Sequence, residues 1–299
     1  MTTTEAYTRT RASASPVADR ARLLVTSPDG PGIVAAISGA LSELSANIVG
    51  LAQHTTDPRG GTFFQRTEFD LPGLGQREDE VREAIGVVAA RYDATWSLSA
   101  AARRKRVAIL ASTTDHCLLD LLWRQRRDEI PMDVPMVISN HPVLADDVHA
   151  FGIPFHYVPV IDGDKRRVED RHLELLKGQV DLIVLARYMQ IISGSFLASV
   201  GVPVINIHHS FLPAFIGAGP YAKAKARGVK LVGATAHYVT QDLDEGPIIE
   251  QDVARATHAD TTATLTRRGA DIERQVLSRA VAWHCEDRVI RHANSTVVF

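Results

Sequence analysis

The sequence predicts an α/β protein with two domains, a small ferredoxin-like domain followed by a larger Rossmann-like domain with a mostly parallel sheet. The 299 residues are enough for two domains that each have a core of their own. Strand and helix patterns follow one another as β-α-β-β-α-β over residues 21–99, the order of a ferredoxin-like layout. From residue 107 onward, short apolar runs alternate with helical patterns, which favours a parallel sheet covered on both faces.

The first domain is predicted element by element from its sequence patterns. A strand at 22–26 leads into the turn Ser27–Gly32, where proline and glycine supply the special backbone angles. The next segment places five apolar residues on one helical face, namely Ile33, Val34, Ile37, Leu41 and Leu44. The remaining elements are strands at 46–51 and 62–71, a helix at 78–91 and an edge strand at 92–98.

Two short segments flank this domain. Residues 1–20 are expected to be a disordered tail, because they are rich in Thr, Ser, Ala and Arg and lack the apolar stretch of a signal peptide. Residues 100–106 are expected to be a linker, which places the second domain at 107–299. The basic run 103–106 indicates a solvated junction, since it is short and has no interleaved aromatic residues.

The second domain is predicted to contain several buried parallel strands. The strands are expected at 107–111, 134–139, 155–159, 181–186, 202–207 and 234–239, with helices at 118–127 and 172–177. In sheets of this kind, ligands gather at the carboxyl ends of the strands.

Three polar residues fall where such a site is expected. Asn206 and His208 end a predicted strand and, being two residues apart, point to the same face. Asp244 lies in the loop after the strand that contains His237. An amide, an imidazole and a carboxylate together can polarise a carbonyl, move a proton and orient the imidazole.

Other interpretations of these residues stay open at this point. An Asn-X-His pair can simply close a strand end with hydrogen bonds, and His237 can be a satisfied histidine that lines the same cleft. The pair His208-His209 invites a metal site, but adjacent strand residues face opposite sides and no His-Glu-X-X-His spacing is present, so we expect no metal. The absence of a Gly-X-Ser-X-Gly elbow disfavours a serine hydrolase. The residues alone therefore indicate an α/β enzyme with a polar site near 206–208 and 242–247.

Composition restricts the partners and the compartment. A formal net charge of -2 and a pI near 6.6 give no electrostatic argument for nucleic acid or an anionic membrane. No apolar run is long enough to span a bilayer. Two cysteines, Cys117 and Cys285, cannot form a disulfide framework, which indicates a reducing compartment and a cytoplasmic protein.

Motifs in the second domain resemble those of folate-dependent formyltransferases. They are Asn206-Ile-His208-His-Ser210, Leu212-Pro213, His237-Tyr-Val-Thr240 and Leu243-Asp244-Glu-Gly246-Pro247, preceded by the segment Asp181–Ile192. The resemblance implies that Asn206, His208 and Asp244 are the catalytic residues. It also implies a substrate pocket for the pterin ring, formed by Met189, Gln190, Ile191, Ile192, His237, Val239, Thr240, Gln241 and Asp242.

The first domain resembles the ACT domain, a small regulatory module that often binds amino acids. The resemblance rests on the turn Asp29–Gly32, which opens a helix, and on Ala46-Asn47-Ile48 after it. It implies an amino-acid effector, such as glycine or methionine, bound near Asp29, Gly30, Gly32 and Asn47. The alternative is a domain that only dimerises or holds the enzyme together, because fold alone does not establish function. ACT-like domains commonly pair through their sheets, so a homo-oligomer is expected.

Together with the segments Asp115–Trp123 and Ser139–Pro142, these features make the chain resemble the formyltetrahydrofolate deformylases from Arg22 to Phe299. The resemblance implies hydrolysis of 10-formyltetrahydrofolate to formate and tetrahydrofolate, feeding one-carbon and purine metabolism, with the folate as substrate and no separate cofactor. Related glycinamide ribonucleotide formyltransferases carry a glycine-rich loop for the substrate phosphate, whereas the corresponding stretch here, 111–117, has no glycine.

One loop departs from the deformylase pattern. Deformylases usually show Gly-Ala-Lys-Pro-Tyr-His, whereas this chain has Gly217-Ala-Gly219-Pro-Tyr-Ala222 and so lacks a basic residue and a histidine. Two alternative functions therefore stay open. One is a folate-dependent formyltransferase acting on a non-phosphorylated amine, and the other is a catalytically weak protein that senses folate or an amino acid.

Overall fold

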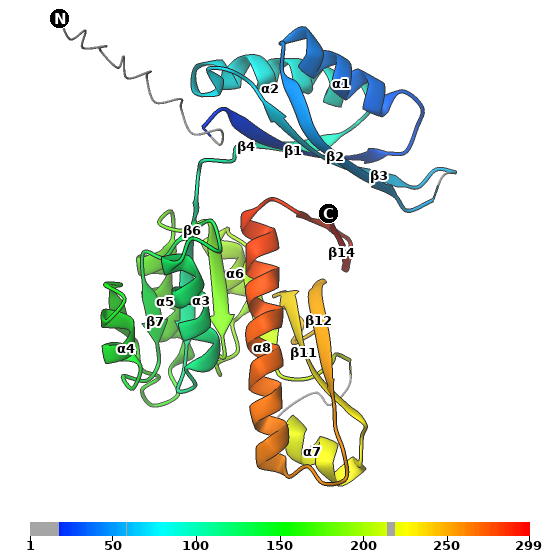
Figure 1. Cartoon of the computed structure of the whole chain (residues 1–299). Helices are drawn as coiled ribbons and strands as arrows, with labels where there is room; N and C mark the ends of the chain where they lie inside the picture. Colours follow the sequence, from blue (N-terminus) through cyan, green and yellow to red (C-terminus); the bar gives the residue numbers. More distant parts are fainter. Residues whose placement is uncertain (1–17, 58, 214–218) are drawn as a thin grey trace, which may run out of the picture. The chain divides into compact units, whose positions relative to one another are not determined.

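The chain was analysed as a computed structural model, which describes residues 18–57, 59–213 and 219–299. It divides into two compact units, one ending at Arg103 and the other beginning at Arg104, and each is described by itself (Figure 1). Most of the expected tail at 1–20 lies outside the described residues, and a strand begins at Arg20.

The first unit is an antiparallel sheet with two helices. Its strands are β1 (Arg20–Pro28), β2 (Asn47–Thr55), β3 (Thr62–Asp70) and β4 (Thr95–Ala100), paired in the order β2-β3-β1-β4. Helices α1 (Ile33–Glu43) and α2 (Leu74–Arg91) lie on one face of this sheet. The predicted ferredoxin-like layout is confirmed.

Helix α1 shows why the turn and the apolar spacing matter. Gly32 precedes it with a φ of 91°, a backbone conformation that glycine adopts without strain. Ile33, Ile37 and Leu41 then recur every fourth residue and are all buried against the sheet. Burial of each such side chain stabilises the fold by roughly 1.5–3 kcal/mol relative to exposure.

The second unit is built on a mixed sheet whose strands run in the order β12-β11-β10-β9-β5-β7-β8, with β6 paired to β5. Their bounds are β5 (Lys105–Ala111), β6 (Met132–Asp133), β7 (Val137–Ser139), β8 (Phe155–Tyr157), β9 (Leu182–Ala186), β10 (Val204–His208), β11 (Leu231–Tyr238) and β12 (Ile248–Arg255). Pairing is parallel from β10 to β8 and antiparallel where β11 joins β10 and β12. The predicted mostly parallel sheet is confirmed, and β12 adds an antiparallel edge.

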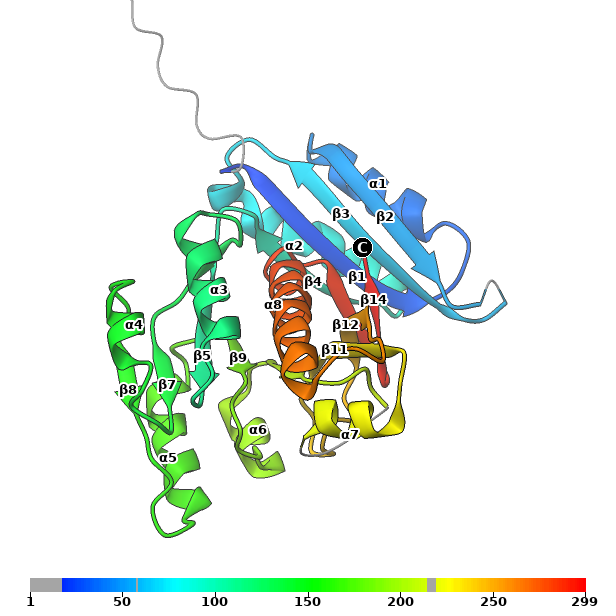
Figure 2. The same cartoon turned by 60° about the horizontal axis from the view of Figure 1, so that its bottom comes forward.

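Helices cover both faces of this sheet, as the alternation within β5 shows. Val107 and Ile109 join the core under α3 (His116–Arg126) and α8 (Thr262–Cys285), whereas Ala108 and Leu110 join the core under α5 (Lys165–Leu176) and α6 (Gly194–Val200) (Figure 2). The other elements are α4 (Ala145–His149), α7 (Pro220–Arg227) and the hairpin of β13 (Val289–His292) and β14 (Ser295–Val298).

The basic run at the start of the second unit is engaged by acidic residues. The Lys105 ammonium lies 2.6 Å from the Asp287 carboxylate, and the Arg106 guanidinium lies 2.9 Å from that of Asp181.

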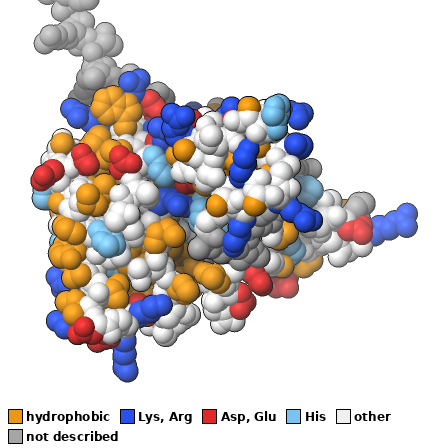
Figure 3. Space-filling model, turned by 90° about the horizontal axis from the view of Figure 1, so that it is seen from below, with side chains coloured by type: hydrophobic (Ala, Val, Ile, Leu, Met, Phe, Trp, Pro, Cys, Tyr) orange, Lys and Arg blue, Asp and Glu red, His pale blue; other side chains and the backbone are white. Residues whose placement is uncertain are grey.

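On the face drawn in Figure 3, acidic, basic and hydrophobic side chains of the described residues are interspersed. Within the described ranges, no helix has both the length and the apolar character needed to cross a membrane.

Candidate active site

Two of the expected catalytic residues lie at the carboxyl end of β10. Asn206 and His208 alternate with Ile205 and Ile207, which are buried in the core beneath α8. Asn206 stands opposite His237 of the antiparallel neighbour β11. The strand period of two therefore gathers an amide and two imidazoles at one edge of the sheet.

Asp244 reaches the same place from the loop between β11 and β12. One of its carboxylate oxygens, Oδ2, lies 3.2 Å from His208 Nδ1, and the other, Oδ1, lies 3.8 Å from His237 Nε2. The hydrogen bond from His208 lowers the pKa of the Asp244 carboxyl below its ordinary value, although burial opposes this. Asp244 is therefore ionised at neutral pH.

The hydrogen-bond pattern assigns the tautomer of His237. Its Nδ1 lies 3.0 Å from the carbonyl oxygen of Tyr238, and a carbonyl can only accept, so Nδ1 carries the hydrogen. Burial lowers the pKa of His237, which keeps the ring neutral and leaves Nε2 as an acceptor. Asn206 Nδ2 donates to that nitrogen at 3.2 Å. The Asn206 amide is thereby oriented, and its second hydrogen stays available to a ligand.

His208 presents the complementary arrangement. Its Nδ1 donates to Asp244, so its Nε2 is the atom that can exchange a proton with a ligand. That Nε2 is buried and has no hydrogen-bond partner among the described residues. Buried polar atoms are nearly always satisfied, so an unsatisfied imidazole nitrogen beside a cavity indicates a functional group.

A cavity of about 350 Å³ connects these groups with the expected substrate pocket. All nine residues expected to hold the pterin line it together with Asn206, His208 and Asp244. Met189, Ile191 and Leu243 are each 58% exposed, which leaves apolar surface that a flat ring can cover. A larger hollow, along α5, lacks the three catalytic candidates.

Comparisons with known proteins agree with this geometry. The formyl transferase family model matches residues 105–281, and the ACT domain model matches residues 21–86. The formyltetrahydrofolate deformylase of Mycobacterium tuberculosis (strain ATCC 25618 / H37Rv) is 59% identical over 283 residues, which cover 94% of this chain and 91% of the relative. The deformylase of Bacillus subtilis (strain 168) is 52% identical, with 94% of each chain covered. The chain belongs to the formyltetrahydrofolate deformylase family.

A solved structure extends the family assignment to three dimensions. The crystal structure of a formyltetrahydrofolate deformylase from Pseudomonas syringae pv. tomato str. DC3000 superposes with a TM-score of 0.89 at 45% identity, and 94% of each chain is covered. The two-domain architecture of this chain is therefore that of a known deformylase, and the resemblance inferred from the motifs is confirmed.

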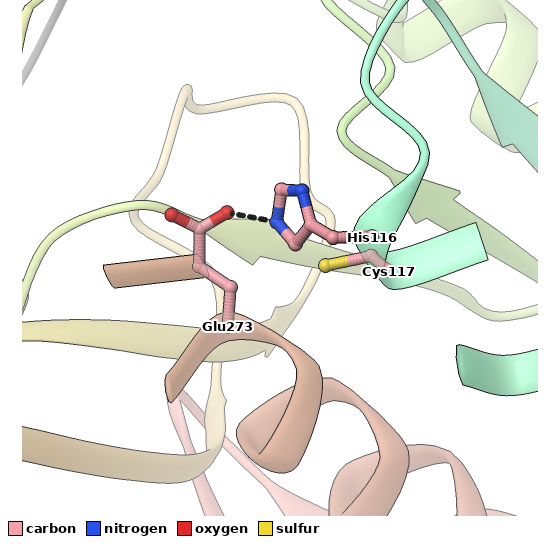
Figure 4. A group of neighbouring side chains, drawn as sticks. All are labelled: His116, Cys117 and Glu273. Carbon is pink, nitrogen blue, oxygen red and sulfur yellow. Dashed lines mark hydrogen bonds and ion pairs between the residues drawn. The ribbon is translucent and has the colours of Figure 1, made fainter. Parts of the chain in front are cut away.

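Sequence reasoning missed a charged cluster beside the three catalytic candidates. Arg187 directly follows β9 and lines the cavity, and its Nε lies 3.4 Å from the Glu273 carboxylate. Glu273 comes from α8, is 2% exposed and receives hydrogen bonds from the Tyr221 hydroxyl at 2.6 Å and from His116 Nε2 at 2.9 Å (Figure 4). A lone glutamate on the buried face of a helix is a signal that could have indicated this cluster.

The electrostatics of this cluster keep Glu273 charged. Burial alone raises the pKa of its carboxyl, but the His116 hydrogen bond, the Arg187 charge and the Tyr221 hydrogen bond together bring that pKa below its ordinary value. Burial and the Arg187 charge lower the pKa of His209, on the cavity wall, to about 4. His209 is therefore neutral at physiological pH.

The ligand atoms of His116, Cys117 and Glu273 lie within 4.8 Å of one another, as in some metal sites. His116 and Glu273 are already joined to each other by a hydrogen bond. Burial and the Glu273 charge raise the pKa of the Cys117 thiol, whereas a metal binds the thiolate. The geometry favours an ion-paired network at this position.

The glycine-free loop at 111–117 is held by side-chain hydrogen bonds. Ser112 Oγ donates to Asn140 Oδ1 at 2.7 Å and accepts from the backbone N–H of Met189 at 2.9 Å. Ser112 therefore ties this loop to the segment that lines the cavity.

The expected effector residues divide into two groups. Asp29, Gly30 and Gly32 line a hollow of about 720 Å³ between α1 and β2. Asn47 pairs with Asp70 at the start of β2 and does not line this hollow. In the loop that departs from the family pattern, Gly217 lies outside the described residues and Gly219 caps the start of α7 with a φ of 66°.

Proposed function

We propose that this chain hydrolyses 10-formyltetrahydrofolate to formate and tetrahydrofolate, with Asn206, His208 and Asp244 as its catalytic residues. The observation that carries the proposal is the buried Nε2 of His208, which has no hydrogen-bond partner among the described residues and borders an apolar-walled cavity while Asp244 holds the other ring nitrogen. Membership of the formyltetrahydrofolate deformylase family supports the choice of substrate.

The cavity suits the pterin ring of a folate. Met189 and Ile191 present apolar surface, and residues 239–242, three of them polar, also line the cavity. Flat heteroaromatic ligands are commonly held by apolar walls and a few polar groups that fix their orientation.

In the first chemical step, water attacks the formyl carbon, so that a C–O bond forms and the formyl oxygen gains negative charge. Asn206 Nδ2 and protonated His208 Nε2 donate hydrogen bonds to this oxygen. Donors of this kind each contribute about 3–4 kcal/mol to stabilising the transition state. Asp244, 3.2 Å from His208 Nδ1, stabilises the imidazolium.

In the second step the C–N10 bond breaks. Asp244 takes a proton from the attacking water through ordered solvent, and Asp244 or His208 returns a proton to N10 as it leaves. The products are tetrahydrofolate, formate and one released proton, so atoms and charges balance. Hydrolysis of the formyl amide supplies tetrahydrofolate and formate to one-carbon and purine metabolism.

The 111–117 loop supports water as the acceptor of the formyl group. It has no glycine to bring backbone N–H groups close to a phosphate, and Ser112 is already engaged by Asn140 and Met189. A phosphorylated acceptor is therefore poorly matched to this site.

The proposal is tested by incubating the purified chain with 10-formyltetrahydrofolate alone and following formate and tetrahydrofolate. Release without an acceptor supports hydrolysis. Release only after a non-phosphorylated amine is added identifies a formyltransferase, and folate binding without turnover identifies a sensor.

We propose further that the first unit binds an amino-acid effector in the hollow formed by Asp29, Gly30 and Gly32. Val49 and Leu51 on β2 are each 43% exposed, which supports a homo-oligomer formed through this sheet. Titration with glycine and methionine in a calorimeter, compared with an Asp29→Ala variant, tests the effector site.

A cytoplasmic location completes the proposal, supported by the low cysteine content.

A further inference from the structure

We propose that Arg187 binds the carboxylate of the formate that hydrolysis produces, and so adapts the site to water as the acceptor. This inference rests on the proposed hydrolysis and assigns a residue outside the catalytic set of Asn206, His208 and Asp244.

The strand register places Arg187 beside the reacting groups. Strands β9 and β10 are parallel, and Asn206 pairs with Leu185, so two residues further along each chain Arg187 comes level with His208. Arg187 has a φ of 62°, which breaks the strand alternation at this point. Its side chain is 14% exposed and lines the same cavity as His208 and Asp244.

The Arg187 guanidinium is paired with a fixed carboxylate and also borders the cavity. Glu273 lies 3.4 Å from Arg187 Nε, and that carboxylate is itself fixed by Tyr221 and His116. Arg187 Nε is buried without a hydrogen-bond partner among the described residues. A planar guanidinium, a group with five N–H donors, is therefore positioned at the cavity wall.

The charges of the site match the charge that the reaction creates. The formyl amide is neutral, and addition of water with cleavage of the C–N10 bond turns it into an anion. Asp242 and Asp244 also line this cavity, and His209 and His237 are neutral, so Arg187, although paired with Glu273, is the one permanently cationic side chain among the described residues of the cavity wall. Guanidinium binds carboxylate in a bidentate fashion, with stronger hydrogen bonds than neutral donors form.

Transfer of the formyl group to an amine would give this charge no anionic product to bind. A transferase releases a neutral amide, which has no need of a fixed cation at the formyl site.

The test is inhibition of the full-length enzyme by formate, measured with Arg187→Gln and Arg187→Lys variants at constant ionic strength. Loss of a hydrogen-bonded charge weakens binding by about 10- to 100-fold, so the formate inhibition constant should rise by that factor in Arg187→Gln. Arg187→Lys keeps the charge without the planar guanidinium, so its formate inhibition constant should lie between those of the wild type and Arg187→Gln. Arg171→Gln, an exposed arginine paired with Glu174 on α5, is the matched control and should resemble the wild type.

Formate binding measured by calorimetry in the presence of tetrahydrofolate separates this inference from the proposed function, because it needs no turnover. The role of Arg187 is overturned if the wild type hydrolyses the substrate and the Arg187→Gln variant binds formate as tightly as the wild type. A wild type that binds no formate under these conditions also overturns it. A wild type that binds formate through Arg187 but releases none from 10-formyltetrahydrofolate contradicts only the hydrolytic function.

Discussion

Asp244 Oδ2 lies 3.2 Å from His208 Nδ1, and this single contact decides which imidazole nitrogen faces the cavity. With Nδ1 committed to the carboxylate, Nε2 is the nitrogen that meets the substrate. The contact also explains why the Asp244 carboxyl keeps a pKa below its ordinary value within a partly buried loop.

Replacement of Asp244 by Asn should abolish turnover while folate binding is largely retained. The isosteric amide removes the charge that stabilises the His208 imidazolium and allows the ring to adopt the other tautomer. Comparable changes in other enzymes lower kcat by roughly 10⁴-fold. Single-turnover rates and tetrahydrofolate affinity are the measurements, and an Asp244→Asn variant that still turns over at a rate close to wild type removes Asp244 from the mechanism.

Replacement of Asn206 by Ala should lower kcat by about 10²–10³-fold, the effect of losing one oxyanion donor. KM should change little, because the hydrogen bond strengthens as negative charge develops on the formyl oxygen. Asn47→Ala in the first unit, away from both cavities, is the matched control. A change confined to KM would mean that Asn206 binds the ground state rather than the transition state.

Replacement of Glu273 by Gln should destabilise the fold at pH 7 by about 3–5 kcal/mol, because it leaves the buried Arg187 charge without its partner. The folded-state pKa of Glu273 lies below the ordinary value of 4.5. Its stabilising contribution is therefore complete above that value and is lost as pH falls through the lower folded pKa.

Denaturant unfolding of the wild type and the Glu273→Gln variant at several pH values measures this effect. The stability difference between them should be constant near neutrality and shrink in strongly acidic solution. Tyr221→Phe, which removes one hydrogen bond to the same carboxylate, should cost about 1 kcal/mol. A difference between wild type and Glu273→Gln that does not vary with pH would show that Glu273 acts only through packing.

Replacement of Gly246 by Ala should lower both stability and activity. A Cβ at this position would lie 1.8 Å from the carbonyl oxygen of Tyr238, so the loop that carries Asp244 must move. Gly86→Ala in α2 meets nothing within 4 Å and is the matched control. That control should stabilise the protein by roughly 0.5–1 kcal/mol, the difference in helix propensity. Equal melting temperatures for the two variants would contradict the close approach at Gly246.

Local patterns were sufficient to predict most strands of the two sheets and the catalytic candidates, but not the edge strand β12. Apolar runs such as Leu182–Ala186 are buried on both faces, and the period of two places Asn206 and His208 together without any tertiary information. Helix α5 was predicted only at 172–177, because its first half is charged and Val168, His172 and Leu176 are the buried positions. The hydrogen bond from Arg167 N–H to the Asp164 side chain marks its true start.

The contact between Arg187 and Glu273 was beyond local reasoning, although Glu273 alone, an acidic residue among the apolar positions of its helix, was a signal. In the sequence, Arg187 is only the polar residue that follows an apolar run. Nothing in the sequence indicates that its backbone adopts a left-handed conformation. Glu273 lies in α8, a region to which the sequence patterns assigned no element, and the two residues meet only because α8 packs over the sheet. Contacts between residues so far apart in the chain are fixed by tertiary packing.

The most direct test of the account is incubation of the wild-type chain with 10-formyltetrahydrofolate in ¹⁸O-labelled water, without any amine, followed by mass analysis of the formate. The account predicts stoichiometric release of formate and tetrahydrofolate, with one oxygen of each formate derived from the labelled water. Absence of formate under these conditions, or its release only after an amine acceptor is added, would contradict hydrolysis as the function of this site.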